Sequence, residues 1–180
     1  TLPFIQQKEG FAVSIALVGK NGTPYLGVVY DPYRNNLYHA IHKKGAFKNN
    51  KKWECEVENA FLSYVTDKAF KQIPRYKEIE KILRQRVHLH GLDSYQIIEG
   101  GGAVMNAIYA IENAPACMIK FPKKAVGGGA IWDYAATTCI YKELGFKATE
   151  FAGKSLQLNK KSSPFMNKEG VFFSTEPRVT

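Results

Sequence analysis

Short hydrophobic runs separated by turn residues fill the first third of the chain. Two runs, residues 11–18 and 25–30, flank Lys20-Asn21-Gly22, a tripeptide typical of a tight hairpin turn. Hydrophobic residues return at 37–41, and another hairpin begins at residues 45–49. This pattern predicts an antiparallel meander, in which each strand pairs with the one before it.

After about residue 59, segments with the helical period alternate with short hydrophobic runs. Hydrophobic residues recur at helical spacing in a charged segment, which predicts a surface helix over about residues 75–87. Similar spacing between residues 104 and 111 marks a second helix. Strands are predicted at residues 61–65, 95–98, 116–121 and 171–174. Strands that alternate with helices indicate a parallel or mixed sheet with helices packed on it.

A glycine triplet at residues 127–129 precedes a helical pattern that closes at Gly145, a residue type typical of helix C-termini. Asp133 is predicted at or next to the N-terminus of this helix, where the helix dipole and unpaired N–H groups stabilise a carboxylate. A narrow stripe of small and hydrophobic residues predicts close packing against a sheet. The stripe consists of Ala135, Ala136, Cys139, Ile140 and Leu144. The local pattern alone is fully explained if Asp133 serves only as a helix cap.

Length and composition limit the class of protein. With 180 residues, the chain is long enough for one domain with a full core. It has no hydrophobic run as long as a membrane span, and no signal peptide is recognisable in it. Its first residue, Thr1, is compatible with a processed or truncated start. The odd number of widely spaced cysteines favours a reducing, cytoplasmic location. The net charge of +9 suits polyanionic partners, although a solvated lysine-rich surface explains it equally well.

A second glycine triplet, Gly100-Gly101-Gly102, ends a predicted strand and begins a predicted helix. Backbone N–H groups at such a start bind anions, and the missing side chains allow an anion to approach closely. A tight strand-to-helix turn accounts for the triplet at least as well. The triplet is therefore a candidate anion site that needs independent support.

The segment Trp132-Asp133-Tyr134-Ala135-Ala136 resembles the Trp-Asp-x-Ala-Ala motif of the inositol monophosphatase superfamily, which consists of Mg²⁺-dependent phosphomonoesterases. Residues 101–106 are similar to the segment that lines the substrate pocket in that superfamily, and the strands of the first third also match in order. The resemblance covers nearly the whole chain. It implies an α/β layered fold, with an antiparallel meander followed by a mixed sheet flanked by helices.

The resemblance also implies roles for individual residues. Asp133 corresponds to a metal ligand, and Gly101, Gly102 and Ala103 correspond to substrate-binding positions. Thr1 falls on the last residue of the family motif Asp-Pro-x-Asp-Gly-Thr, where the threonine helps to orient the attacking water. The cofactor that the resemblance implies is Mg²⁺, which would activate this water for attack on a phosphate monoester.

The chain also departs from the family pattern. The two Asp residues of that motif, an upstream metal-binding Glu and the N-terminal helices have no counterpart here. The chain therefore resembles a partial domain, with residues 1–58 as the C-terminal half of the first lobe and 59–180 as the second lobe. Because one Asp does not make a Mg²⁺ site, we expect the 180 residues alone to be catalytically incomplete.

The substrate expectation rests on the segment from residue 114 to 131, which contains no Asp or Glu. Inositol monophosphatases carry an acidic residue there, whereas Phe121-Pro122-Lys123 resembles the Tyr-Pro-Arg segment of 3'(2'),5'-bisphosphate nucleotidases. Lys123 could thus neutralise a second phosphate, although a solvated lysine is an equally good interpretation. A bisphosphate nucleotidase-like phosphatase is the leading expectation, and an inositol monophosphatase is the alternative.

The expected partner is a phosphorylated small molecule, with no membrane association and a homodimer left open. A catalytically incomplete module that binds anions or nucleic acid is an alternative from another class. The chain carries no recognisable nucleic-acid-binding signature, which disfavours that alternative.

Overall fold

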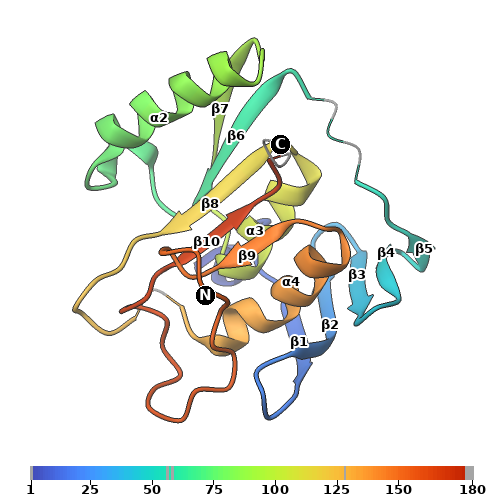
Figure 1. Cartoon of the computed structure of the whole chain (residues 1–180). Coiled ribbons are helices and arrows are strands. Elements are labelled where there is room, and N and C mark those ends of the chain that lie inside the picture. The colour runs from blue at the N-terminus through green and yellow to red at the C-terminus, as the bar shows by residue number, and fades with distance from the viewer. Residues whose placement is uncertain (1, 56, 58, 128, 177–180) are drawn as a thin grey trace.

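Two five-stranded sheets organise the protein, which we describe from a computed structural model (Figure 1). The structure describes residues 2–55, 57, 59–127 and 129–176. In the first sheet the strands follow chain order, β1-β2-β3-β4-β5, and all neighbours are antiparallel. Its strands are β1 (Val13–Val18), β2 (Pro24–Asp31), β3 (Asn36–Ile41), β4 (Gly45–Lys48) and β5 (Lys51–Lys52). The meander expected from the sequence is therefore present.

The second sheet has the strand order β7-β6-β8-β10-β9 and is mixed. Strand β6 runs parallel to both β7 and β8, whereas β10 is antiparallel to β8 and β9. The strands are β6 (Phe61–Thr66), β7 (Ser94–Glu99), β8 (Ala116–Lys120), β9 (Lys147–Thr149) and β10 (Val171–Ser174). Because β6 and β8 are parallel neighbours, the segments that follow their C-terminal ends emerge at the same edge of the sheet.

Helices cover both faces of this second sheet. Alternate side chains of β6 point to opposite faces, so Leu62 and Tyr64 pack with Leu83 of α2, while Val65 packs with Ile108 of α3. The helical elements are α1 (Leu2–Ile5), η1 (Phe70–Gln72), α2 (Tyr76–Leu89), α3 (Ala103–Glu112) and α4 (Ile131–Glu143). The expected class, an antiparallel meander followed by a mixed sheet flanked by helices, is confirmed.

Helix α4 is more deeply buried than its sequence pattern indicates. Residues 134–141 are all buried, whereas the pattern predicted only a narrow stripe. The reason is that α4 packs against β1 to β4 of the first sheet and also contacts α3 and β9 (Figure 1). A helix covered from two sides buries nearly its whole circumference. Its N-terminal residues, including Asp133, are thus fixed relative to both sheets.

Gly27 in β2 allows α4 to lie close to the first sheet. A Cβ atom at this position would overlap the carbonyl oxygen of Ala136 and lie 2.9 Å from the Cβ atom of Cys139. The obstructing atoms include helix backbone, which cannot move aside as a flexible side chain can. The small residues of the α4 stripe therefore match a glycine on the strand that faces them.

We expect Gly27→Ala to destabilise the protein by about 2 kcal/mol, because an added methyl group must push α4 away from β2. The urea midpoint of unfolding measures this effect. Leu17→Ala is the control, since the Leu17 side chain is 60% exposed on the other face of the sheet. A Gly27→Ala midpoint that falls no further than that of the control would contradict the close approach described above.

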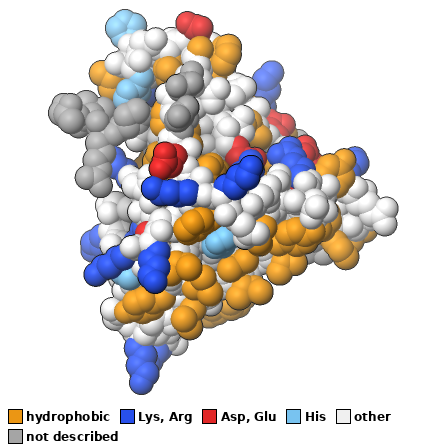
Figure 2. All heavy atoms as spheres, turned by 90° about the vertical axis from the view of Figure 1, so that its right-hand side faces the viewer, with side chains coloured by type: hydrophobic (Ala, Val, Ile, Leu, Met, Phe, Trp, Pro, Cys, Tyr) orange, Lys and Arg blue, Asp and Glu red, His pale blue; other side chains and the backbone are white. Residues whose placement is uncertain are grey.

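The outer face of the first sheet is hydrophobic as well. Figure 2 shows hydrophobic side chains gathered in a band across the lower half of the view. The strand register places the following apolar residues together on this face: Val13, Ile15, Leu17, Leu26, Val28, Tyr30, Leu37, Ile41 and Phe47. Because both faces of the sheet carry apolar residues, its strands have near-continuous hydrophobic runs rather than a clean alternation.

Local differences from the sequence prediction are small. No helix was predicted in residues 1–7, but the described part of this segment contains the single turn of α1. The surface helix predicted at 75–87 is α2, which extends to Leu89. Short strand β9 was not predicted, because it has only three residues and lies against β10. None of the helices among the described residues is both long and apolar enough to cross a membrane.

Candidate functional site

Asp133 is the third residue of α4 and caps the helix that carries it. Its Oδ2 atom accepts a hydrogen bond from the Ala130 N–H, with a distance of 2.7 Å between Oδ2 and N. An acidic residue three positions after the N-cap commonly reaches back in this way. The predicted position of Asp133 is therefore correct. Its role as a metal ligand stays a prediction, and Oδ1 has no hydrogen bond among the described residues.

The pKa of the Tyr134 phenol depends on the charges around the N-terminus of α4. Burial raises the pKa of Tyr134, and the negative charges of Asp133 and Asp67 raise it further. Both carboxylates thus lie near enough to act on the same buried hydroxyl group. Asp67 follows β6, so this interaction links the edge of the second sheet with the N-terminus of α4.

The triplet Gly100-Gly101-Gly102 connects β7 to α3, as the sequence predicted. Gly102 is the N-cap residue of α3, and Ala103 is the first helical residue. No side chain caps this helix, and its first turn contains no acidic residue. A Cβ atom at Gly101 would overlap the Oδ1 atom of the buried Asn106 side chain. Glycine is therefore required at 101 by packing, and the α3 N-terminus keeps the positive end of its dipole without a side-chain counter-charge.

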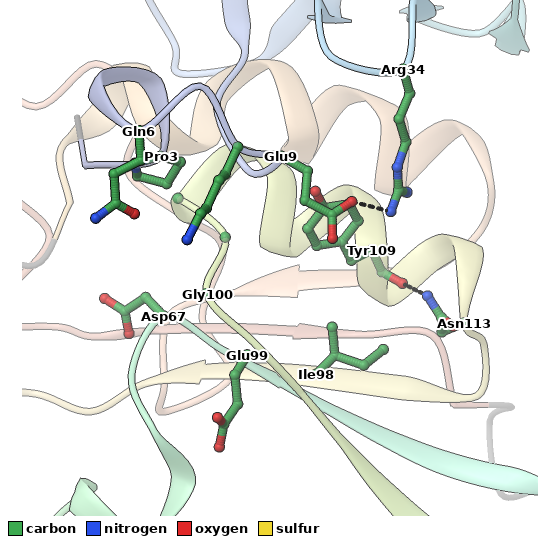
Figure 3. Close-up of a pocket in the computed structure, with 13 residues that line it drawn as sticks. Pro3, Gln6, Glu9, Arg34, Asp67, Ile98, Glu99, Gly100, Tyr109 and Asn113 are labelled. Carbon is green, nitrogen blue, oxygen red and sulfur yellow. Dashed lines mark hydrogen bonds and ion pairs between the residues drawn. The ribbon is translucent and has the colours of Figure 1, made fainter.

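A cavity of about 760 Å³ opens at this turn, and we call it the glycine cavity (Figure 3). Gly101 and Gly102 line it together with Asp67. Figure 3 shows Glu9 and Arg34 facing each other on one side of the cavity, where their side chains form an ion pair at 2.5 Å. The lining thus includes charged side chains of both signs.

A second cavity, of about 740 Å³, lies at the edge where β6 and β8 end, and we call it the lysine cavity. Lys120 and Lys123 line it, and the Lys120 ammonium pairs with the Asp67 carboxylate at 2.6 Å. Lys123 is held through its backbone, since its N–H donates to the Asn167 carbonyl oxygen at 2.7 Å. Asp67 lines both cavities, so they adjoin at this residue.

The structure places the predicted site residues in neighbouring but separate positions. Gly101 and Gly102 line the glycine cavity, whereas Lys123 lines the lysine cavity. Asp133 lines neither cavity. It is linked to Asp67 through Tyr134, because both carboxylates raise the pKa of the Tyr134 hydroxyl group. Thr1 lies outside the described residues.

Asp67 is not among the site residues that were predicted from the sequence. The sequence feature that could have identified Asp67 as a site residue is its position directly after a buried strand, in a segment where strands and helices alternate. The C-terminal ends of parallel strands are the usual place for binding residues in such sheets. The pairing of β6 with β8, which brings Lys120 beside Asp67, could not be read from the local sequence.

The donor set for a metal ion is incomplete in the part of the chain that the structure describes. No three His, Cys, Asp or Glu residues come together there in a group that could hold a metal ion. Mg²⁺ requires near-octahedral oxygen coordination, and one carboxylate with one oxygen engaged in a helix cap does not supply it. The described residues therefore do not by themselves fit a bound Mg²⁺ ion.

Comparison with known proteins gives a consistent family signal. The model of the inositol monophosphatase family matches residues 1–175. An inositol-1-monophosphatase of Bacillus subtilis is 26% identical over 163 residues, which is 86% of this chain and 54% of that protein. A fructose-1,6-bisphosphatase/inositol-1-monophosphatase of Thermotoga maritima is 28% identical over 178 residues, or 93% of this chain and 59% of that protein.

A solved structure shows the same fold. SaIMPase-II with bound 2'AMP has a TM-score of 0.68 at 23% identity, covering 96% of this chain and 60% of that one. The chain thus spans a little more than half the length of the relatives that it matches.

Proposed function

Because the chain belongs to the inositol monophosphatase family, we propose that it is part of a phosphatase that hydrolyses phosphate monoesters of small metabolites. The observation that carries this proposal is the start of α3. Gly101 and Gly102 bring an uncapped helix N-terminus to the wall of a cavity that charged side chains line. Backbone N–H groups and the helix dipole at such a position bind phosphate oxygens.

Each predicted site residue has a role in this proposal. Gly101 and Ala103 would bind the phosphate through backbone N–H groups. Gly102, whose own N–H already donates to the Gly10 carbonyl oxygen at 2.8 Å, would let the phosphate approach closely because it has no side chain. Thr1 would orient the attacking water, and Asp133 would contribute one carboxylate to the Mg²⁺ site. Since the described residues do not complete such a site, the remaining oxygen ligands would come from elsewhere in the complete enzyme. By complete enzyme we mean a protein that carries this chain together with the rest of the family domain.

The experiment that tests this proposal is phosphate release by the complete enzyme. We expect Mg²⁺-dependent release from adenosine 3',5'-bisphosphate or inositol 1-phosphate at rates well above background. Chelation of the metal should abolish the release, and added Mg²⁺ should restore it. Absence of release from both substrates over a range of Mg²⁺ concentrations would contradict a phosphatase function.

For the substrate, we propose a nucleoside bisphosphate, with inositol monophosphate as the alternative. The Lys123 side chain lines its cavity and has no ion pair among the described residues, so its charge is available to a second phosphate. The segment from residue 114 to 131 offers no carboxylate to bind sugar hydroxyl groups. The names of the Bacillus subtilis and Thermotoga maritima relatives favour the inositol alternative.

We expect Lys123→Ala to lower kcat/KM for adenosine 3',5'-bisphosphate by about tenfold, and kcat/KM for inositol 1-phosphate by about twofold or less. Only the bisphosphate presents the additional charge that a lysine ammonium can neutralise. Lys124→Ala is the matched control, because Lys124 is exposed like Lys123 but does not line the cavity. Equal losses on the two substrates, or a wild-type preference for inositol phosphate, would favour the alternative.

A further inference from the structure

The lysine cavity continues into a second space beyond its lysine side chains. A third cavity, of about 160 Å³, lies between α2 and the second sheet, and its lining shares five residues with the lysine cavity. The shared residues are Tyr64, Arg75, Ile119, Phe121 and Phe151. We call the continuous space the aromatic groove. It runs from the Lys123 loop, over the Phe121 and Phe151 rings, toward α2.

Two phenylalanine rings form the wall of the groove. The ring centroids of Phe121 and Phe151 are 5.3 Å apart, with a tilt of 55° between the ring planes. The Arg75 guanidinium carbon lies 5.4 Å from the Phe121 centroid, which is a cation–π arrangement. Phe151 is 41% exposed although it contacts another ring. The wall therefore offers aromatic surface that a planar ligand could cover.

Positive charge gathers at one end of the groove. Lys68 and Lys123 line this end, and neither has an ion pair among the described residues. The other three cations of the groove are already engaged: Lys120 pairs with Asp67, Arg75 with Glu78, and Arg86 with Glu176. The groove thus has two unneutralised ammonium groups next to an aromatic wall.

The loop that carries Lys123 is fastened to the body of the protein. The Asn167 side chain is nearly buried, and its Nδ2 atom donates to the Lys123 carbonyl oxygen at 3.1 Å. The Asn167 carbonyl oxygen in turn accepts a hydrogen bond from the Lys123 N–H. The backbone from which this ammonium extends is therefore fixed before any ligand binds, which lowers the entropic cost of binding.

We propose that the aromatic groove binds the nucleoside part of a nucleotide substrate, with the base against Phe121 and Phe151 and an anionic group at Lys68 and Lys123. The proposal rests on the phosphatase function proposed above, because the nucleoside monophosphate would be the leaving group of that reaction. A base gains stacking energy on aromatic surface. A polyol placed there would instead lose hydrogen bonds to water without replacement.

The test compares adenosine 5'-monophosphate with ribose 5-phosphate, since these two probes differ only in the base. Their dissociation constants for the 180-residue chain can be measured by calorimetry and by saturation-transfer NMR on the ligand protons. We expect the nucleotide to bind about tenfold more tightly. Phe151→Leu should reduce this ratio to about twofold or less, whereas Phe151→Tyr should retain it, because only the tyrosine keeps an aromatic face.

Phe61→Leu is the matched control, since Phe61 is 44% exposed and lies outside the groove. Equal affinity of the wild-type chain for the two probes would overturn the proposal, as would failure to bind adenosine 5'-monophosphate at millimolar concentration. Because binding requires no turnover, the two proposals can fail separately. A base preference without phosphate release by the complete enzyme would support the groove and contradict the phosphatase, and the opposite result would do the reverse.

Discussion

Asp133→Asn is expected to lower phosphate release by the complete enzyme by about 100-fold or more, with little loss of thermal stability. Asparagine keeps an oxygen that can accept the hydrogen bond from the Ala130 N–H, so α4 stays capped. The substitution removes the negative charge that a Mg²⁺ ligand must supply. The loss of the charge–dipole interaction at the helix start should cost only about 0.5 kcal/mol.

Activity and melting temperature of the same preparation are both needed to interpret this variant. Glu54→Gln is the charge-matched control, because the Glu54 side chain is 76% exposed and pairs only with the exposed Lys52 in the described part of the chain. Unchanged activity of Asp133→Asn would show that Asp133 is only a helix cap. A large drop in melting temperature together with activity would also count against a specific role in metal binding.

The second large effect concerns the 180-residue chain by itself. We expect no tight Mg²⁺ site in a calorimetric titration, and phosphate release at the background level. Mg²⁺ prefers several oxygen ligands, and the described residues bring no three suitable side chains together. The proposed catalytic set of this chain is thus too small to bind the ion that the chemistry needs.

A folded sample is the essential control for this negative result. Circular dichroism with a cooperative thermal transition would show that the missing activity does not arise from unfolding. Adenosine 5'-monophosphate binding by the same sample would show that its aromatic groove is intact. Robust Mg²⁺-dependent turnover by the purified chain would prove that our account of the missing ligands is wrong.

The sequence by itself determined those features whose cause is local. Hydrophobic runs and turn residues predicted the meander, because hairpins join neighbouring segments of the chain. The glycines before Asp133 and the triplet at 100–102 predicted two helix starts, since caps and turns depend on adjacent residues. The Trp132-Asp133 motif pointed to the family, which the match over residues 1–175 confirms.

Only the tertiary structure decided which of these features adjoin. Asp67 was not among the predicted site residues, but the parallel pairing of β6 with β8 places it beside Lys120, between two cavities. Lys123 and Lys124 are adjacent in the sequence, but of the two only Lys123 lines the lysine cavity. The burial of α4 on two sides also exceeded the stripe that its own periodicity predicted.

The physical reason is the distance along the chain between the residues that meet. Arg75, Phe121 and Phe151 belong to three separate segments and form one wall only after the second sheet has assembled. Hydrophobic periodicity reports which face of a helix or strand is buried, but it does not report what covers that face. The chemical groups of the candidate site were therefore visible in the sequence, whereas their arrangement around Asp67 and the aromatic groove was set by long-range packing.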